Sequence, residues 1–376
     1  MKCKLSDICS FRKGKVEVEN LNAKNYISTE NMLPNKCGIT EASSLPTVSL
    51  TQEYNSGDVL VSNIRPYFKK IWQAEYDGGC SNDVLVFVPK PNTDKDFLYY
   101  VLADDDFFTY SMATSKGTKM PRGDKTSIMQ YEVPLIDLQV QKKIASVLKA
   151  LDEKIKLNNE INNNLEQQAK ALYKDWFFDF SPFSTEGNLP DGWHLGTVGD
   201  IIQLHDSKRV PLSGSERDKM EKIYPYYGAT SLMDYVDNYL FDGIYLLLGE
   251  DGTVVDRLGF PILQYVYGQF WVNNHAHIIT GKEGFSVEEL YLFFSLTNIK
   301  SIVTGAVQQK VSQQNLKKVP AIIPSEQALS AFDEIIQPIF AQIRNLRDEN
   351  ANLSQLRDTL LPKLMSGELD VSNIEL

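Results

Sequence analysis

The segment Tyr131-Glu132-Val133-Pro134-Leu135-Ile136, with Gln141 after it, recurs as Leu316-Lys317-Lys318-Val319-Pro320-Ala321-Ile322-Ile323, with Gln327 after it. The separation is 186 residues both from Pro134 to Pro320 and from Gln141 to Gln327. In each copy, a Val-Pro pair and an apolar, strand-like stretch lead into a long helical pattern. Because self-similarity at a fixed separation is typical of repeated units, the sequence predicts two copies of a globular domain followed by a helix.

The two helical patterns, 138–177 and 326–365, carry apolar heptads typical of a coiled coil. In the first, the predicted a positions are Ile144, Leu151, Asn158, Leu165 and Leu172, and the d positions are Val147, Lys154, Ile161 and Gln168. In the second, the a positions are Ile336, Ile343, Asn350 and Arg357, and the d positions are Phe332, Ile339, Leu346, Leu353 and Leu360. We expect an antiparallel pair that acts as a spacer. Pro338 should remove one backbone hydrogen bond of the second helix, and a proline inside a helix can kink it. Two amphipathic helices packed separately on their own domains remain the alternative.

The predicted fold class is mixed α/β (α+β), with two globular domains alternating with the two long helices. The predicted segments are a first domain at 1–137, a central helix at 138–180, a second domain at 181–323 with a linker at 181–192, and a C-terminal helix and tail at 324–376. Strands are predicted at 57–61, 83–88, 243–248 and 276–279, and shorter helices at 96–113 and 287–303.

Composition allows several classes of protein and argues against others. The chain has 376 residues, 43% of them apolar, which is enough for two folded domains. A net charge of −11 argues against a protein that coats DNA with basic residues, although a local basic patch can still contact phosphates. Cys3, Cys9, Cys37 and Cys80 form no CxxC pair and indicate reduced thiols. Without a signal peptide or a membrane-length apolar stretch, we expect a cytoplasmic protein that does not bind membranes.

The sequence contains none of the common catalytic motifs. It has no GxxxxGK[ST] phosphate loop, no GxSxG, HExxH or GxGxxG motif, and no Asn/Asp-Pro-Pro-Tyr/Phe motif of adenine methyltransferases. His275 and His277 form a metal-like pair, but no third ligand cluster is evident, so we expect no metal site. Adjacent carboxylates, as in Glu250-Asp251 and Asp104-Asp105-Asp106, are typical of turns and helix surfaces. We therefore predict a non-enzymatic chain without catalytic residues and without a cofactor of its own.

Two basic segments of the first domain, 62–70 and 116–125, are candidates for DNA reading. Pro66 favours an extended or turn conformation that would present Arg65. Glycines at 117 and 123 let backbone amides approach a phosphate, and an arginine can bind a guanine edge at two points. The candidate residues are Arg65, Lys69, Lys70, Lys116, Lys119, Arg122 and Lys125. A solvated basic loop is the alternative for each segment.

The second domain has counterparts at 206–209, 226–230 and 305–310. The candidate residues are Lys208, Arg209, Tyr226, Tyr227, Gln308, Gln309 and Lys310. Glutamine suits adenine, and tyrosine can pack on sugars or thymine methyls, with core packing as the alternative for the tyrosines. The two copies share their Val-Pro segment and helix but differ in these loops, as reading two different half-sites would require.

Several segments resemble the specificity subunits of type I restriction-modification systems. Segments 148–158 and 171–180 are similar to the central spacer of that family, and 189–193 (Leu-Pro-Asp-Gly-Trp) to the start of its second target-recognition domain. Segment 357–369 resembles its C-terminal end, and 226–230, 241–243, 249–252 and 272–277 resemble one class of its recognition domains. The first domain resembles no such class, and Pro338 departs from a straight spacer. The resemblance otherwise covers nearly the whole chain.

The resemblance implies a bipartite double-stranded DNA target, with one half-site for each target-recognition domain and a helical spacer that sets the gap. It also implies two methyltransferase (M) subunits docked on the helices and motor-nuclease (R) subunits in the full complex. S-adenosylmethionine, ATP and magnesium would then belong to those partners. Two alternatives remain open, namely a DNA-reading module of another modification enzyme, such as a type IIB-like system, and a coiled-coil adaptor that does not bind DNA.

Overall fold

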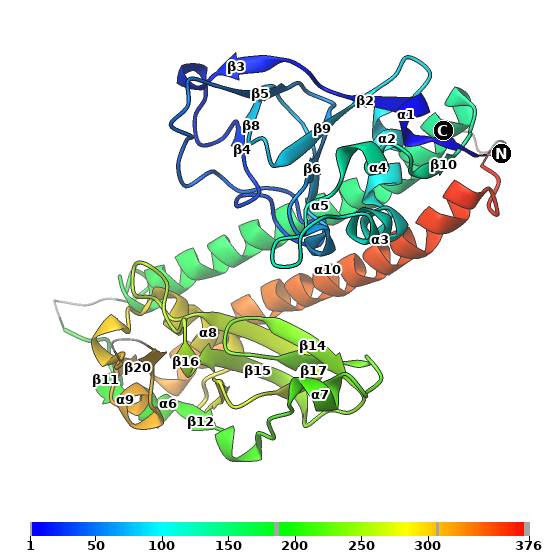
Figure 1. The fold of residues 1–376 in the computed structure, drawn as a ribbon. Coiled ribbons are helices and arrows are strands. Elements are labelled where there is room, and N and C mark those ends of the chain that lie inside the picture. Colours follow the sequence, from blue (N-terminus) through cyan, green and yellow to red (C-terminus); the bar gives the residue numbers. More distant parts are fainter. Residues whose placement is uncertain (1, 184–187, 306–307, 372–376) are drawn as a thin grey trace. The chain divides into compact units, whose positions relative to one another are not determined.

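The computed structural model describes residues 2–183, 188–305 and 308–371 (Figure 1). The chain forms two compact units: unit 1 comprises Met1–Leu157 and Glu349–Leu376, and unit 2 comprises Asn158–Asp348. The long helices α5 (Leu138–Phe177) and α10 (Glu326–Ser366) each run from one unit into the other. Each unit therefore contains a part of both helices, together with its own sheets.

Unit 1 is built on two four-stranded sheets. Its elements are β1 (Lys2–Lys4), α1 (Leu5–Ile8), β2 (Cys9–Phe11), β3 (Lys15–Glu17), η1 (Val18–Asn20), β4 (Tyr26–Ile27), β5 (Leu50–Tyr54), β6 (Val59–Ser62), η2 (Pro66–Phe68), β7 (Ile71–Gln73), β8 (Gly78–Cys80), β9 (Val84–Pro89), α2 (Lys95–Ala103), α3 (Asp105–Ala113), α4 (Lys125–Ile128) and β10 (Glu132–Pro134). The sheets have strand orders β2-β9-β6-β7 and β3-β5-β8-β4. Every residue of β6 is buried, as expected of a central strand made of Val-Leu-Val-Ser.

Unit 2 is built on one six-stranded sheet of order β12-β18-β15-β17-β13-β14. Its elements are β11 (His194–Thr197), α6 (Val198–Ile201), β12 (Ile202–Leu204), η3 (Asp206–Lys208), α7 (Gly214–Arg217), β13 (Tyr224–Tyr227), β14 (Leu232–Val236), β15 (Phe241–Gly249), β16 (Asp251–Gly252), β17 (Leu263–Val272), β18 (Ala276–Gly281), α8 (Val287–Leu296), η4 (Lys300–Ile302), β19 (Gln309–Lys310), α9 (Gln313–Lys317) and β20 (Pro320–Ile323). Helix α8 contacts β15, β17 and β18, and its apolar residues share one core with the long helices.

The predicted internal repeat is confirmed in three dimensions. The globular part of each unit begins with a strand, a four-residue helix and a second strand, which are β1-α1-β2 in unit 1 and β11-α6-β12 in unit 2. The first of these strands pairs antiparallel with the Val-Pro strand, β10 or β20, directly before the long helix. The mixed α/β fold class with two repeated domains and two long helices is therefore correct.

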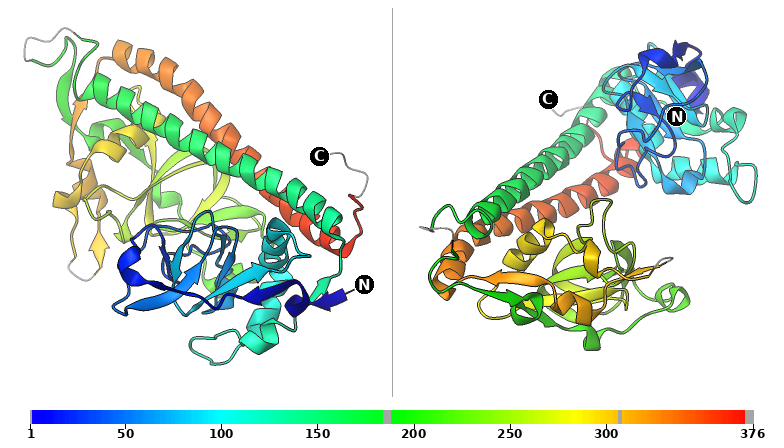
Figure 2. Two further views of the ribbon diagram at one scale, coloured as in Figure 1. Left: turned by 90° about the horizontal axis from the view of Figure 1, so that it is seen from above. Right: turned by 90° about the vertical axis from the view of Figure 1, so that its left-hand side faces the viewer.

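Both long helices have the predicted extent, and α10 continues through the exposed Pro338 (Figure 2). Within unit 1, Arg357 of α10 contacts Asp152 of α5 (Nη1 to Oδ1, 2.7 Å). Within unit 2, the rings of Tyr173 and Phe332 pack 5.5 Å apart. An early part of one helix thus meets a late part of the other in each unit, which makes the pair antiparallel.

The predicted heptad register is right for α10 and partly wrong for α5. All predicted a and d residues of α10 are buried or half-buried. In α5, the predicted d residues Lys154 and Gln168 are exposed, whereas Leu148 and Ala169 are buried. The d positions of α5 therefore lie one residue later than predicted. The heptad pattern gave little weight to Ala169, whose small side chain allows close packing.

The predicted strands all exist, but neither of the shorter helices spans its predicted range without a break. Segment 96–113 forms two helices, α2 and α3, since Asp104 has an extended backbone and caps α3 with its side chain. Segment 287–303 forms α8 only to Leu296, followed by the short η4. Among the described residues, no helix is long and apolar enough to cross a membrane.

Candidate nucleic-acid interface

A short hairpin, residues 116–122, connects α3 to α4 in unit 1. Two backbone hydrogen bonds close it, from the N–H of Lys116 to the carbonyl of Arg122 (2.8 Å) and from the N–H of Arg122 to the carbonyl of Lys116 (2.9 Å). Gly117 has a φ of +92°, in the left-handed region that favours glycine. Asp124 then caps α4 by accepting a hydrogen bond from the N–H of Ser127 (2.9 Å). We name residues 116–122 the first hairpin.

The first hairpin is bound to the other predicted DNA-reading segment of unit 1. The N–H of Arg65 donates to the carbonyl of Pro121 (2.8 Å), and the N–H of Gly123 donates to the carbonyl of Asn63 (3.1 Å). The structure therefore joins segments 62–70 and 116–125, which lie far apart in the sequence, into one surface.

Unit 2 contains a second hairpin, residues 304–310, of which 306–307 lie outside the described residues. The N–H of Thr304 donates to the carbonyl of Lys310 (2.9 Å), and the N–H of Lys310 donates back (2.8 Å). Gly305 again stands second, with a φ of +89°. Ser312 then caps α9 by accepting from the N–H of Asn315 (3.2 Å). The first and second hairpins thus share their closure, their glycine and the cap that follows.

The neighbouring segments correspond as well. In unit 1, the N–H of Asn63 donates to the carbonyl of Asp83 (2.8 Å), and Ile64 forms a β-bridge with Arg122. In unit 2, the N–H of Glu250 donates to the carbonyl of His275 (2.8 Å), and Asp251 pairs with Lys310. The N–H of Val311 then donates to the carbonyl of Glu250 (2.8 Å). In each unit the hairpin segment meets the residues after one strand (β6 or β15), and the first of those residues donates a backbone hydrogen bond to the residue before the neighbouring strand (β9 or β18). We name this repeated backbone arrangement the hairpin frame.

Three of the seven cations predicted in unit 1 form ion pairs with acidic side chains. The ion pairs are Lys116–Asp124 (2.7 Å), Arg122–Asp83 (2.9 Å) and Lys69–Asp105 (2.7 Å). Hydrogen bonds from Lys116 and Ser127 lower the pKa of Asp124 to about 2. The side chains of Lys116 and Arg122 are nevertheless 81% and 56% exposed. They can exchange these single exposed ion pairs for a phosphate or a base at small cost.

The side chains of Lys70 and Lys125 contact other residues of unit 1. Lys70 Nζ donates to the carbonyl of Thr29 (2.6 Å) and lies 5.7 Å from the ring of Phe68. Partial burial lowers the pKa of Lys70. Lys125 Nζ lies 5.9 Å from the ring of Phe11. Lys70 therefore supports the segment more than it presents a charge.

Arg65 and Lys119 have no ion-pair partner among the residues that the structure describes. Arg65 is half-buried, its Nε is buried without a hydrogen-bond partner in the described part of the chain, and its φ is +50°. A left-handed arginine with an unsatisfied nitrogen is a strained feature of the kind found at binding sites. Lys119 is exposed within the first hairpin.

Two of the residues predicted in unit 2, Arg209 and Tyr226, are largely buried and already form hydrogen bonds within the unit. The side chain of Arg209 is 13% exposed and donates to Glu250 and to the carbonyl of Ala276, both at 2.7 Å. Tyr226 is 1% exposed, and its hydroxyl accepts from the N–H of Leu212 (3.1 Å). Neither offers a free group at the surface, because ion pairing and core packing already engage them.

The other residues predicted in unit 2 are more accessible. Tyr227 is half-buried against Phe270, and burial raises its pKa. Lys208 is exposed at the end of η3 and has no ion-pair partner in the described ranges. Gln308 is exposed, and Gln309 lies half-buried in β19. Lys310 lies 3.4 Å from Glu250 and is 52% exposed.

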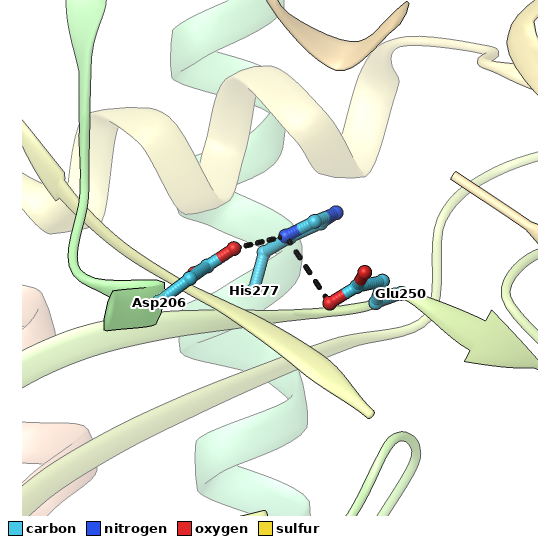
Figure 3. Close-up of side chains that lie close together, drawn as sticks. All are labelled: Asp206, Glu250 and His277. Atoms are coloured by element: carbon cyan, nitrogen blue, oxygen red, sulfur yellow. Dashed lines mark hydrogen bonds and ion pairs between the residues drawn. The ribbon is translucent and has the colours of Figure 1, made fainter. Parts of the chain in front are cut away.

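A buried polar cluster contacts the residue that follows the second hairpin, and Figure 3 shows its members Asp206, Glu250 and His277. His277 is fully buried, with Nδ1 2.6 Å from Asp206 and 3.8 Å from Glu250, and with Nε2 2.8 Å from the carbonyl of Val311. Asp206 also accepts from Gln313 (2.6 Å). Burial raises the pKa of Asp206, but hydrogen bonds led by the one from His277 outweigh it and hold the pKa below its usual value. The cluster ties the segment after the second hairpin to the sheet.

The same cluster has the composition of a metal site, since Asp206, Glu250 and His277 bring ligand atoms within 4.8 Å of one another. The expectation that no further ligands lie beside the histidines is therefore wrong for His277, whereas His275 precedes β18 and contacts Asp251 (2.6 Å). The guanidinium of Arg209 already bonds Glu250. Because a carbonyl only accepts, Nε2 of His277 is the donor to Val311, and Nδ1 is already engaged by Asp206. The donor set fits an ion-pair cluster better than a bound cation.

Sequence reasoning missed several residues of the frame. Asn63 and Asp83 were seen only as neighbours of a basic loop and of a strand, although both fix the first hairpin. Arg257, in the loop before β17, also escaped notice, because it is the only cation in its loop and follows directly after Asp256. The repeated Gly117 and Gly305, each directly before the hairpin tip, were the one available signal.

Comparison with known proteins also divides the chain into two similar segments. The family model described as type I restriction modification DNA specificity domain matches residues 1–167 and 190–355. The type I restriction enzyme MjaIX specificity subunit of Methanocaldococcus jannaschii is 26% identical, over 76% of this chain and 72% of that protein. The type I restriction enzyme HindI specificity subunit of Haemophilus influenzae is 24% identical, over 92% of this chain and 94% of that protein.

The fold is also similar to a solved structure. The S subunit of a type I restriction-modification system from M. genitalium has a TM-score of 0.57 at 17% identity, over 99% of this chain and 96% of that one. The match extends over both units and both long helices.

Proposed function

The chain belongs to the family defined by the type I restriction modification DNA specificity domain, and on that premise we propose that each unit reads one half of a bipartite DNA target through its hairpin frame. The specificity subunit itself then performs no chemistry. It directs partner subunits to methylate adenine or to cleave DNA.

The repeated hairpin frame is the observation that carries this proposal. The same backbone hydrogen bonds and the same left-handed glycine occur in both units, whereas the exposed side chains differ. The first hairpin carries Lys116, Lys119 and Arg122, and the second carries Gln308 and Gln309. A constant scaffold with variable side chains suits two readers of different sequences, because base edges are distinguished by side-chain donors and acceptors.

The proposed base contacts in unit 1 are Arg65, Lys119 and Arg122, with Lys69, Lys116 and Lys125 toward phosphates. In unit 2 we propose Lys208, Tyr227, Gln308, Gln309 and Lys310. Tyr226 and Arg209 take supporting roles, because the structure buries them.

The remaining parts of the proposal concern partners. Two methyltransferase subunits would dock on α5 and α10, and motor-nuclease subunits would complete the enzyme. S-adenosylmethionine, ATP and magnesium would be bound by those partners. The acidic net charge of −11 fits this division, because the partners then supply part of the attraction to phosphates.

The first test is single-molecule sequencing of methylated adenines in cells with and without the gene. We expect a bipartite motif with a constant gap, which disappears on deletion. Unchanged methylation, in cells whose partner genes are intact, would favour the adaptor that does not bind DNA. A motif that depends on one fused nuclease-methyltransferase gene beside this one would favour the type IIB-like alternative.

The second test assigns the half-sites to the units. Arg122→Ala should relax one position of the first half-site, with a loss of discrimination of about 1–3 kcal/mol and an unchanged second half-site. Lys15→Ala, on the other sheet of unit 1, is the control and should leave both half-sites unchanged. An effect of Arg122→Ala confined to the second half-site would contradict the assignment.

A further inference from the structure

A groove of about 610 Å³ lies beside the second hairpin in unit 2. It is lined by Gly252, Thr253, Val255, Asp256, Arg257, Gln308 and Gln309. One wall is therefore the hairpin strand β19, and the other is the loop between β16 and β17. The register Gly252 to Gln309 connects the two walls through antiparallel pairing.

The loop that carries Arg257 is built to be rigid. The carboxylate of Asp256 accepts three backbone hydrogen bonds, from the N–H groups of Leu258 (2.9 Å), Gly259 (2.7 Å) and Phe260 (2.9 Å). The N–H of Asp256 donates to the carbonyl of Phe260 (2.8 Å). Gly259 has a φ of +97°, so the tight turn requires a glycine there. Arg257 therefore stands on a turn whose backbone is already ordered.

The turn is also anchored to the body of unit 2. Asn298 donates from Nδ2 to the carbonyl of Leu258 (2.7 Å), and the N–H of Ile299 donates to the carbonyl of Gly259 (3.0 Å). Ile299 is 1% exposed and belongs to the core of the unit. A side chain on such a turn loses little backbone entropy when it binds, which favours specific recognition.

Arg257 itself is exposed and has no ion-pair partner among the described residues. The other arginines of unit 2 for which the structure gives contacts, Arg209, Arg217, Arg344 and Arg347, bond to acids or carbonyls. Across the groove, Gln308 and Gln309 supply amide groups without charge. An arginine can bind a guanine edge at two points, and a glutamine can bind an adenine edge in the same way.

We propose that Arg257 reads a guanine edge in the second half-site, and that Gln308 and Gln309 contact the adjoining bases in the same groove. This proposal rests on the function proposed above and adds a specificity residue outside the predicted loops. Its chemistry is direct readout of duplex DNA, with the planar guanidinium facing two acceptors of one base.

The test uses the full chain in its methyltransferase complex and maps the methylated motif with wild-type protein, Arg257→Ala and Arg257→Lys. For base reading, Arg257→Ala should relax one G·C position of the second half-site, with discrimination reduced about 10- to 100-fold. Arg257→Lys should fail to restore that discrimination, because an ammonium cannot bind two acceptors in the same fork geometry. Lys282→Ala is the matched control, since Lys282 is exposed just past the far end of β18, roughly 20 Å from the frame.

Three outcomes separate the proposals. If Arg257→Ala weakens methylation of all sequences equally and Arg257→Lys restores it, Arg257 contacts a phosphate and base reading is overturned. If Arg257→Ala changes nothing while the wild-type motif is intact, the inference is overturned and the proposed function stands. If the wild-type complex shows no motif that depends on this chain, the proposed function fails first.

Discussion

Gly117 and Gly305 show how single residues shape the hairpin frame. Both follow the first residue of their hairpin, with φ values of +92° and +89°. Their surroundings differ, because a Cβ on Gly305 would lie 2.0 Å from the carbonyl oxygen of Gln308, whereas one on Gly117 would lie 3.4 Å from that of Met120. The second hairpin therefore depends on its glycine for space as well as for conformation.

This difference predicts unequal effects of one substitution. Gly305→Ala should weaken binding of duplexes with the second half-site by about tenfold or more, since a clash with backbone adds to the cost of a positive φ. Gly117→Ala should have a smaller effect on the first half-site, of about 1 kcal/mol. Fluorescence anisotropy with the two matched duplexes measures both. Equal losses for the two variants would contradict the role given to the space around Gly305.

At the scale of elements, α8 carries a buried carboxyl group against the two long helices of unit 2. Glu289 is fully buried; its Oε2 accepts from the N–H of Ser286 (2.8 Å) in a capping box. Burial raises the pKa of Glu289 to about 8, and the charge of Asp333 on α10 adds to this. The nearby Tyr173 on α5 is buried as well, and burial raises its pKa. Glu289 is thus protonated in the folded unit at neutral pH.

The direction of this shift predicts a pH dependence. Between the usual value of 4.5 and about 8, the unfolded chain ionises Glu289 while the folded unit keeps the proton. The folded state binds more protons, so its stability falls as pH rises through this window and is level above it. Glu289→Gln should remove this decline and raise the free energy of unfolding at pH 9 by on the order of 5 kcal/mol.

Urea unfolding at pH 5, 7 and 9 tests this dependence. Glu283→Gln, an exposed residue in the turn before α8, is the control and should follow the wild type. Parallel pH profiles for wild type and Glu289→Gln would show that Glu289 is ionised in the folded unit.

At the scale of the whole molecule, the two long helices connect the units without a break. Helix α5 passes from unit 1 to unit 2 at Leu157 and Asn158, and α10 returns at Asp348 and Glu349. Since the pair is antiparallel within each unit, an equal insertion in both helices preserves the heptad pattern. If each unit reads one half-site, as proposed above, the helices are suited to set the gap between the half-sites.

This arrangement predicts that the gap between the half-sites can be changed while both half-sites stay the same. Seven residues inserted near Asn158 of α5 and seven at Asp348 of α10 lengthen each helix by about 10 Å. We expect the methylated motif to gain roughly three base pairs in its gap and to keep both half-sites. A fixed gap, or altered half-sites with an unchanged gap, would show that the helices are not the spacer.

The sequence alone predicted the repeat, the fold class, both long helices and the strands at the centre of each unit. These features are encoded locally, because heptads and apolar runs determine which face of a segment is buried. The register of α5 was harder to predict, since Lys154 and Gln168 gave no apolar signal and Ala169 gave a weak one.

The composition of the candidate site was decided only by the tertiary structure. Strand order brings Asn63 to the first hairpin and places Arg257 across a groove from Gln308, and no local pattern specifies which distant segments meet. Burial likewise removed Tyr226 and Arg209 from the exposed surface. A tyrosine or an arginine has the same sequence signature in a core as on a binding face, so only its packing partners distinguish the two roles.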